Sequence, residues 1–79
     1  MKVKVRYFAI FREQAGCASE AVDFPGGTAE ELFQLMTAKH PSLSTQTAAL
    51  VAVNDEMSAW EQAINENDEV LFFPPVAGG

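Results

Sequence analysis

The last two residues of the chain, Gly78 and Gly79, offer the most distinctive chemistry in the sequence. At average glycine usage, two glycines end a chain by chance in about 0.5% of cases. Because glycine has no Cβ, such a tail can thread a channel too narrow for other residues. An adenylating enzyme could convert its carboxylate to an acyl phosphate anhydride, and a sulfur donor could then form a thiocarboxylate. We therefore predict a functional tail and not a frayed chain end.

The sequence just before these glycines predicts a rigid exit from the fold. Residues 69–73 have the alternation of a strand, with Val70 and Phe72 on one face and Glu69 on the wetter one. Pro74 and Pro75 end this strand because proline donates no ladder hydrogen bond. Proline also fixes φ, so the pair should direct the following residues away from the body of the protein. We expect a folded domain over residues 1–75 and a projecting tail over residues 76–79.

The other reactive side chains form no catalytic grouping in the sequence. His40 is the single histidine and precedes Pro41, so we interpret it as a residue at a helix C-terminus. Cys17 is the single cysteine, which excludes an intramolecular disulfide and a cysteine metal cluster, and no base is indicated near it. Helix capping and solvated turns explain the acidic pairs, which lack the ligand spacing of a calcium loop. We expect no autonomous active site, no bound metal and no bound cofactor.

Length, charge and hydropathy restrict the function classes further. The 79 residues suit one domain, and eleven acidic against five basic residues give a formal net charge of −6. Such a charge disfavours nucleic acid and anionic membranes as partners. No apolar run reaches about 18 residues, and the N-terminal segment alternates charged with apolar residues, so we expect neither a membrane span nor a signal peptide. These features favour a cytoplasmic protein.

Alternating and apolar segments predict the elements that would carry the tail. In residues 2–8, Val3, Val5 and Tyr7 share the presumed core face, and Phe8 falls on the polar face. A helix should begin at Thr28, which has the capping-box spacing with Glu31, and end at Pro41, with Leu32, Leu35 and Met36 buried. The remaining predicted elements are a helical turn at 9–15, strands at 20–24, 50–53 and 69–73, a short extended piece at 57–60, and turns at 26–27, 54–55 and 65–68.

This order favours an α+β fold in which one main helix packs across a mixed sheet of about five strands. That is the β-grasp arrangement of ubiquitin-like proteins, although the pattern also permits other small α+β folds. If the first and last strands pair centrally, Phe8 and Phe73 would form an exposed apolar patch that Met57 could join. The alternative is that loops cover this face and both rings belong to the core.

Three segments resemble the small subunit of molybdopterin synthase, a ubiquitin-like sulfur carrier: residues 67–79, residues 5–13 and residues 51–54. The resemblance implies that an activating enzyme of the ubiquitin-E1 type adenylates Gly79 with ATP and Mg²⁺, and that a sulfur donor protein supplies the thiocarboxylate. It also implies that the tail enters the large subunit, in a heterotetramer of two small and two large chains. There the sulfur would pass to precursor Z to form the molybdopterin dithiolene. The contact residues implied are Phe8, Met57, Phe73, Pro74, Pro75, Val76 and Ala77, followed by Gly78.

Three other functions remain open at this point. The chain could carry sulfur for thiamine, cysteine or tRNA thiolation. It could be a ubiquitin-like modifier joined to lysines through Gly79. It could also be a plain interaction module with an inert tail.

Overall fold

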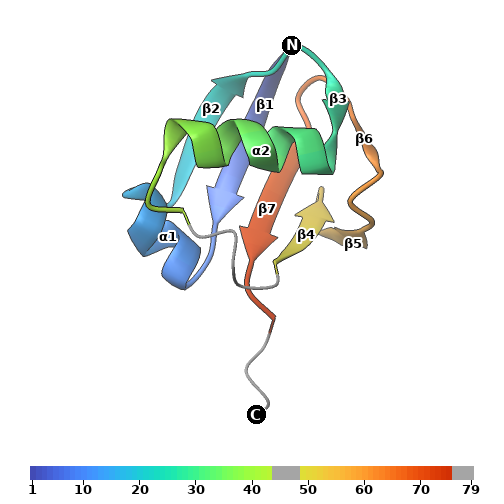
Figure 1. Ribbon diagram of the computed structural model, residues 1–79. Coiled ribbons are helices and arrows are strands. Elements are labelled where there is room, and N and C mark those ends of the chain that lie inside the picture. The colour runs from blue at the N-terminus through green and yellow to red at the C-terminus, as the bar shows by residue number, and fades with distance from the viewer. Residues whose placement is uncertain (44–48, 76–79) are drawn as a thin grey trace.

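A mixed five-stranded sheet, crossed on one face by a long helix, forms the framework of the protein (Figure 1). The computed structural model describes residues 1–43 and 49–75. The elements in chain order are β1 (Lys2–Tyr7), α1 (Ile10–Ala15), β2 (Ser19–Asp23), β3 (Gly27–Thr28), α2 (Ala29–Lys39), β4 (Leu50–Val53), β5 (Glu56–Ser58), β6 (Ala63–Ile64) and β7 (Glu69–Phe73).

The first and last strands lie side by side at the centre of the sheet and run parallel, so the condition for the apolar patch of Phe8 and Phe73 is met. The strand order is β2-β1-β7-β4-β5, in which every other neighbouring pair is antiparallel. A parallel pair cannot be joined by a tight turn, and the chain between β1 and β7 passes through α2 (Figure 1). This topology confirms the predicted β-grasp fold.

The long helix begins at the predicted capping box. The Thr28 hydroxyl accepts a hydrogen bond from the Glu31 backbone N–H at 3.2 Å, and the Glu31 carboxylate accepts one from the Thr28 N–H at 2.9 Å. Leu32 and Met36 are fully buried, but the predicted burial of Leu35 is wrong, since its side chain is 38% exposed. At 100° per residue, Leu35 lies well off the buried stripe, and Phe33 packs against the core in its place.

The structure corrects the prediction in two further places. A small antiparallel sheet of β3 and β6 was not predicted, and Gly27, which was expected in a loop, pairs there with Ile64. Its φ of +139° and the Glu31 carboxylate, which occupies the space of a Cβ, explain why glycine stands at this position. The extended piece at 57–60 is shorter than predicted, because β5 ends at Ser58 and Trp60 lies in a turn.

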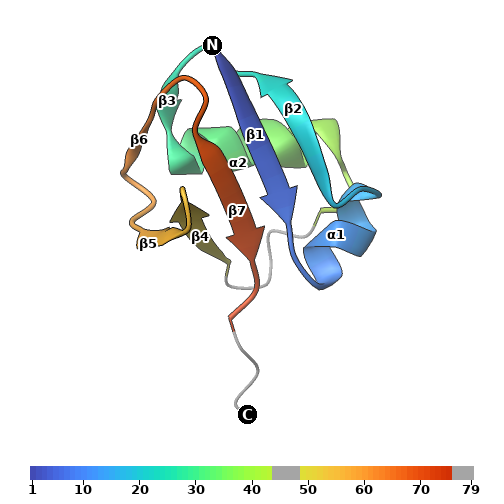
Figure 2. The ribbon, with the colours of Figure 1, turned by 180° about the vertical axis from the view of Figure 1, so that it is seen from behind.

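The hydrophobic core lies between α2 and the sheet. Val3, Val5, Val70 and Phe72 of the two central strands are almost completely buried, as the alternation predicted. Figure 2 shows the opposite face of the sheet, which carries no long helix among the described residues. β7 ends on the side of the sheet away from the N-terminus (Figure 1), so the chain leaves the domain from the middle of the sheet.

Candidate functional site

An aromatic cluster holds the last strand in place just before the chain leaves the domain. The Phe72 ring is fully buried and stacks on Trp60 with ring centroids 6.0 Å apart and an interplanar angle of 7°. Phe33 packs against the same ring at 4.8 Å. The Phe72 carbonyl also accepts a hydrogen bond from the Phe8 backbone N–H at 3.1 Å. The end of the last strand is therefore held both by its backbone hydrogen bonds and by the buried Phe72 side chain.

The exit follows directly from this anchor. β7 ends at Phe73, Pro74 is partly exposed and Pro75 is exposed. Neither proline has an N–H to donate, so strand pairing ends here. Val76, Ala77, Gly78 and Gly79 lie outside the described residues, and the predictions made for these four positions remain predictions.

An apolar surface adjoins the exit. Met57 is 65% exposed and Phe8 is 59% exposed, whereas Phe73 is partly buried. Directly paired residues share one face of a sheet, and the register aligns Met57 with Ala52, Ala52 with Leu71 and Leu50 with Phe73. Phe8 immediately follows β1, beside the end of β7. We call this surface the exit patch, and it consists of Phe8, Leu50, Met57, Leu71 and Phe73, with the buried Ala52 aligned between Met57 and Leu71.

Charged side chains on β1 border the exit patch. Lys4 and Arg6 point to the exposed side of the strand and both pair with Glu69 of β7, at 3.8 Å and 3.2 Å. Because these side chains are about one third to more than one half exposed, the pairs add little stability. They nevertheless neutralise part of the positive charge that Lys2, Lys4 and Arg6 place on this face of β1.

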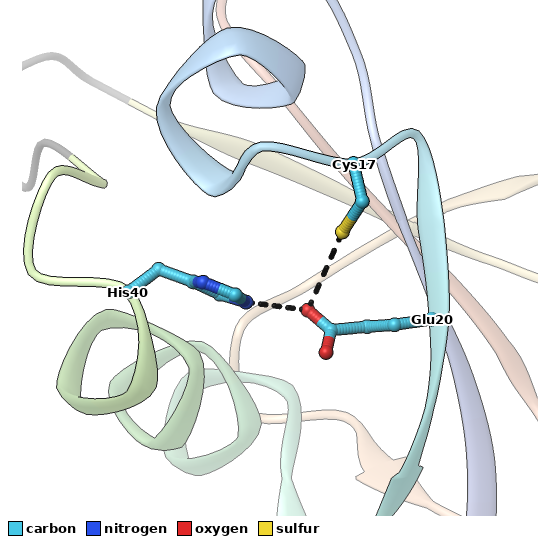
Figure 3. A group of neighbouring side chains, drawn as sticks. All are labelled: Cys17, Glu20 and His40. Atoms are coloured by element: carbon cyan, nitrogen blue, oxygen red, sulfur yellow. Dashed lines mark hydrogen bonds and ion pairs between the residues drawn. The ribbon is translucent and has the colours of Figure 1, made fainter.

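A second group of reactive side chains lies on the other side of the molecule, between β2 and the end of α2. Glu20 of β2 is its centre (Figure 3). Its Oε2 lies 2.6 Å from His40 Nε2 and 3.9 Å from Cys17 Sγ, and it accepts a hydrogen bond from the Tyr7 hydroxyl at 2.8 Å. Its Oε1 accepts one from Lys39 Nζ at 2.6 Å.

These contacts determine the protonation of the group. Partial burial by itself would raise the pKa of Glu20, but hydrogen bonds from Lys39, His40 and Tyr7 outweigh it and lower the pKa from 4.5 to about 2. Burial, followed by the hydrogen bond to Glu20, raises the pKa of Tyr7 far above its ordinary value. Partial burial and the Glu20 charge raise the pKa of Cys17. Cys17 is therefore a neutral thiol at neutral pH, which argues against a role as nucleophile.

The sequence did not predict that Glu20, His40, Cys17, Tyr7 and Lys39 lie together. His40 was expected near the end of the helix, and it is the C-cap residue of α2, but its pairing with Glu20 was missed. A signal was present, because Glu20 shares its strand face with Val22 and Phe24, both of which are buried. A carboxylate on a buried face requires hydrogen-bonding partners, and the single histidine was an available one.

The fold and the exit define the class of protein. A mixed sheet in which the first and last strands lie parallel at the centre, crossed by one main helix, is the β-grasp architecture of ubiquitin-like proteins. In residues 1–43 and 49–75, no helix is long and apolar enough to cross a membrane. The chain belongs to the ThiS family, whose model matches residues 5–79.

Relatives and solved structures show which members of this family the chain resembles. The molybdopterin synthase sulfur carrier subunit of Escherichia coli is 42% identical over 98% of this chain and 99% of its own length. A Pyrococcus furiosus structure, provisionally assigned as molybdopterin converting factor subunit 1, superposes with a TM-score of 0.85 at 31% identity, covering 96% of this chain and 99% of that one.

Two further structures share the fold. SAMP1 of Haloferax volcanii, a small archaeal modifier protein, has a TM-score of 0.85 at 28% identity, with both chains fully covered. A Helicobacter pylori complex of molybdopterin-converting factor subunits 1 and 2 contains a chain with a TM-score of 0.70 at 22% identity, again with full coverage of both chains. At that identity the likeness to the Helicobacter chain concerns the fold alone.

Proposed function

We propose that this protein is the sulfur carrier and small subunit of a molybdopterin synthase, with the Gly79 carboxylate as the group that carries sulfur. The observation that supports this most strongly is the full-length identity of 42% to the Escherichia coli sulfur carrier subunit. The exit from β7 supports it independently, because a fixed strand end followed by two prolines suits a tail that is delivered to another protein.

The proposed chemistry needs no catalytic side chain from this domain. An activating enzyme joins a Gly79 carboxylate oxygen to the α-phosphate of ATP, with Mg²⁺, and releases pyrophosphate. Sulfide sulfur from a donor protein then attacks the acyl carbon, AMP leaves, and a thiocarboxylate remains. The large subunit takes up the tail, and the sulfur passes to precursor Z. Because this chemistry takes place at Gly79 and on the partner proteins, it needs no reactive thiol in this domain, in agreement with the neutral Cys17.

The exit patch is the proposed contact with the large subunit, in a heterotetramer of two small and two large chains. Its most exposed members, Phe8 and Met57, flank the strand from which the tail leaves. An apolar contact there would fix the domain against its partner and leave the tail free to enter the partner's active site. The Helicobacter pylori complex, in which a chain of this fold is paired with subunit 2, is consistent with such a partner.

The test is intact-mass analysis after incubation with the cognate activating enzyme, ATP, Mg²⁺ and a sulfur donor. We expect a mass change that corresponds to replacement of one oxygen by one sulfur, and its loss on deletion of Gly79. No mass change with an activating enzyme that loads another carrier would overturn the proposal. Loaded protein should then convert precursor Z to molybdopterin when the large subunit is added.

A ubiquitin-like modifier is the second candidate, and the structural similarity to SAMP1 favours it. The same activated Gly79 would then form an isopeptide bond with a lysine of a target protein. Mass spectrometry of the cellular conjugates separates the two functions. Lysines that carry the C-terminal residues of this chain would support the modifier, and thiocarboxylate on the free protein would support the carrier.

A further inference from the structure

Three side chains from separate parts of the fold converge on one point away from the exit patch. Cys17 lies in the turn between α1 and β2, Glu20 on β2 and His40 at the C-cap of α2 (Figure 3). Their Sγ, Oε2 and Nε2 atoms all lie within 4.8 Å of one another. Residues 17, 20 and 40 do not have the spacing of a zinc-finger motif, so this convergence is a property of the fold and not of a local sequence.

We propose that Cys17, Glu20 and His40 form a binding site for Zn²⁺. Thiolate, imidazole and carboxylate are the three ligand types that zinc takes in proteins, and three protein ligands with a water molecule complete a tetrahedral site. Binding would replace the contact between Glu20 and His40 by two metal bonds. The thiol proton of Cys17 would be released to solvent, so that a thiolate binds the ion.

The geometry requires movements of up to about 1 Å, since the three donor atoms lie within 4.8 Å of one another. Ligand bonds of about 2.0–2.3 Å place neighbouring donor atoms roughly 3.2–3.8 Å apart in a tetrahedral site. The 3.9 Å between Cys17 Sγ and Glu20 Oε2 is already close to this separation. The Glu20 and His40 atoms, at 2.6 Å, would have to part by about 0.6–0.7 Å. Partly exposed side chains can make that adjustment by rotation about their χ angles.

Two neighbouring residues orient the Glu20 carboxylate, and one of them, Lys39, also places a positive charge 2.6 Å from its Oε1. The Tyr7 hydroxyl donates to Glu20 Oε2 and holds the orientation of the carboxylate, which is the usual role of a group behind a metal ligand. Lys39 pairs with the other oxygen, Oε1, so Oε2 remains directed at the thiol and the imidazole. The Glu20 and His40 side chains are 14% and 19% exposed, which leaves a path for the ion to enter. A bound ion would connect the α1–β2 turn to the end of α2.

The test is calorimetric titration of the full chain with Zn²⁺ after removal of metals with a chelator. We expect one ion per chain at micromolar affinity, weakened at least tenfold in Cys17→Ser and in His40→Gln. The control is Glu66→Gln, which removes an exposed carboxylate from the β6–β7 turn and should bind as the wild type does. Absent binding, or binding that either ligand variant leaves unchanged, would overturn the site.

A second measurement needs no substitution and so does not depend on whether the variants fold. Zn²⁺ should slow alkylation of Cys17 by iodoacetamide, and Co²⁺ should give the charge-transfer absorption of a metal-bound thiolate. Unchanged alkylation at saturating Zn²⁺ would contradict the proposal. Neither measurement involves Gly79, so the zinc site and the sulfur-carrier function can fail independently.

Discussion

Replacing Glu20 with glutamine should remove a defined, pH-dependent part of the stability of this domain. Glutamine keeps the shape of the side chain but cannot ionise. The pKa of Glu20 falls from 4.5 to about 2 on folding, and each unit of pKa corresponds to about 1.4 kcal/mol, so the ionised carboxylate contributes at most about 3 kcal/mol at neutral pH. Because the Lys39 partner is 52% exposed, solvent screening reduces this to about 2 kcal/mol.

The direction of the pH dependence follows from the lowered pKa. The contribution is complete above the unfolded pKa of 4.5 and is lost as the pH falls through about 2. At about pH 3, less than half of the contribution should remain. The free energy of unfolding of Glu20→Gln should therefore lie about 2 kcal/mol below that of the wild type at neutral pH, and the two should converge in acid.

Urea unfolding followed by circular dichroism, at several pH values and with a chelator present, measures this difference. Other carboxylates titrate equally in both proteins, so the difference isolates Glu20. Glu66→Gln is the matched control, because it removes the same charge from an exposed turn and should follow the wild type at every pH. A constant difference between wild type and Glu20→Gln from neutral pH to acid would refute the role assigned to the ionised carboxylate.

Four further changes have expected outcomes. Tyr7→Phe removes one hydrogen bond to the same carboxylate and should cost about 1.5–3 kcal/mol in urea unfolding. Phe72→Ala empties the centre of the aromatic cluster and should cost about 3–5 kcal/mol; a smaller loss would show that the strand is anchored elsewhere. Deletion of Gly79 should abolish sulfur loading and change the free energy of unfolding by less than about 0.5 kcal/mol. Phe73→Asp should weaken large-subunit binding at least about tenfold in calorimetry, whereas Leu35→Asp, on the exposed side of α2, should leave it unchanged.

Elements with strong local patterns could be predicted from the sequence. The alternation in residues 2–8 and 69–73 predicted both central strands and their buried residues, and the capping box placed the start of α2 correctly. The local pattern is sufficient to predict these elements because the residues to be buried all lie on one face of the element. The wrong prediction for Leu35 shows where this method fails. An apolar residue next to the buried stripe of a helix has the same residue type as the buried ones, so the sequence does not separate them.

The features that were missed depend on contacts distant in sequence. β3 and β6 have two residues each, too few to show a period, and their pairing brings Gly27 to Ile64. Glu20 meets His40 because the sheet and the helix end pack together, and no spacing along the chain encodes that distance. Phe8 and Phe73 of the exit patch could be predicted by face, but the facing of Met57 and the alignment across three strands required the register.

The position of β7 explains how one small domain can hold the strand before its C-terminal residues firmly. A last strand at the edge of a sheet would have one partner, and pulling on its tail could detach it. β7 instead pairs with β1 on one side and β4 on the other, and Phe72 fixes its end in the core. A pull on the C-terminal end of β7 therefore acts on a strand that is paired on both sides. Because neither Pro74 nor Pro75 has a backbone N–H to donate, the pairing of β7 ends at Phe73.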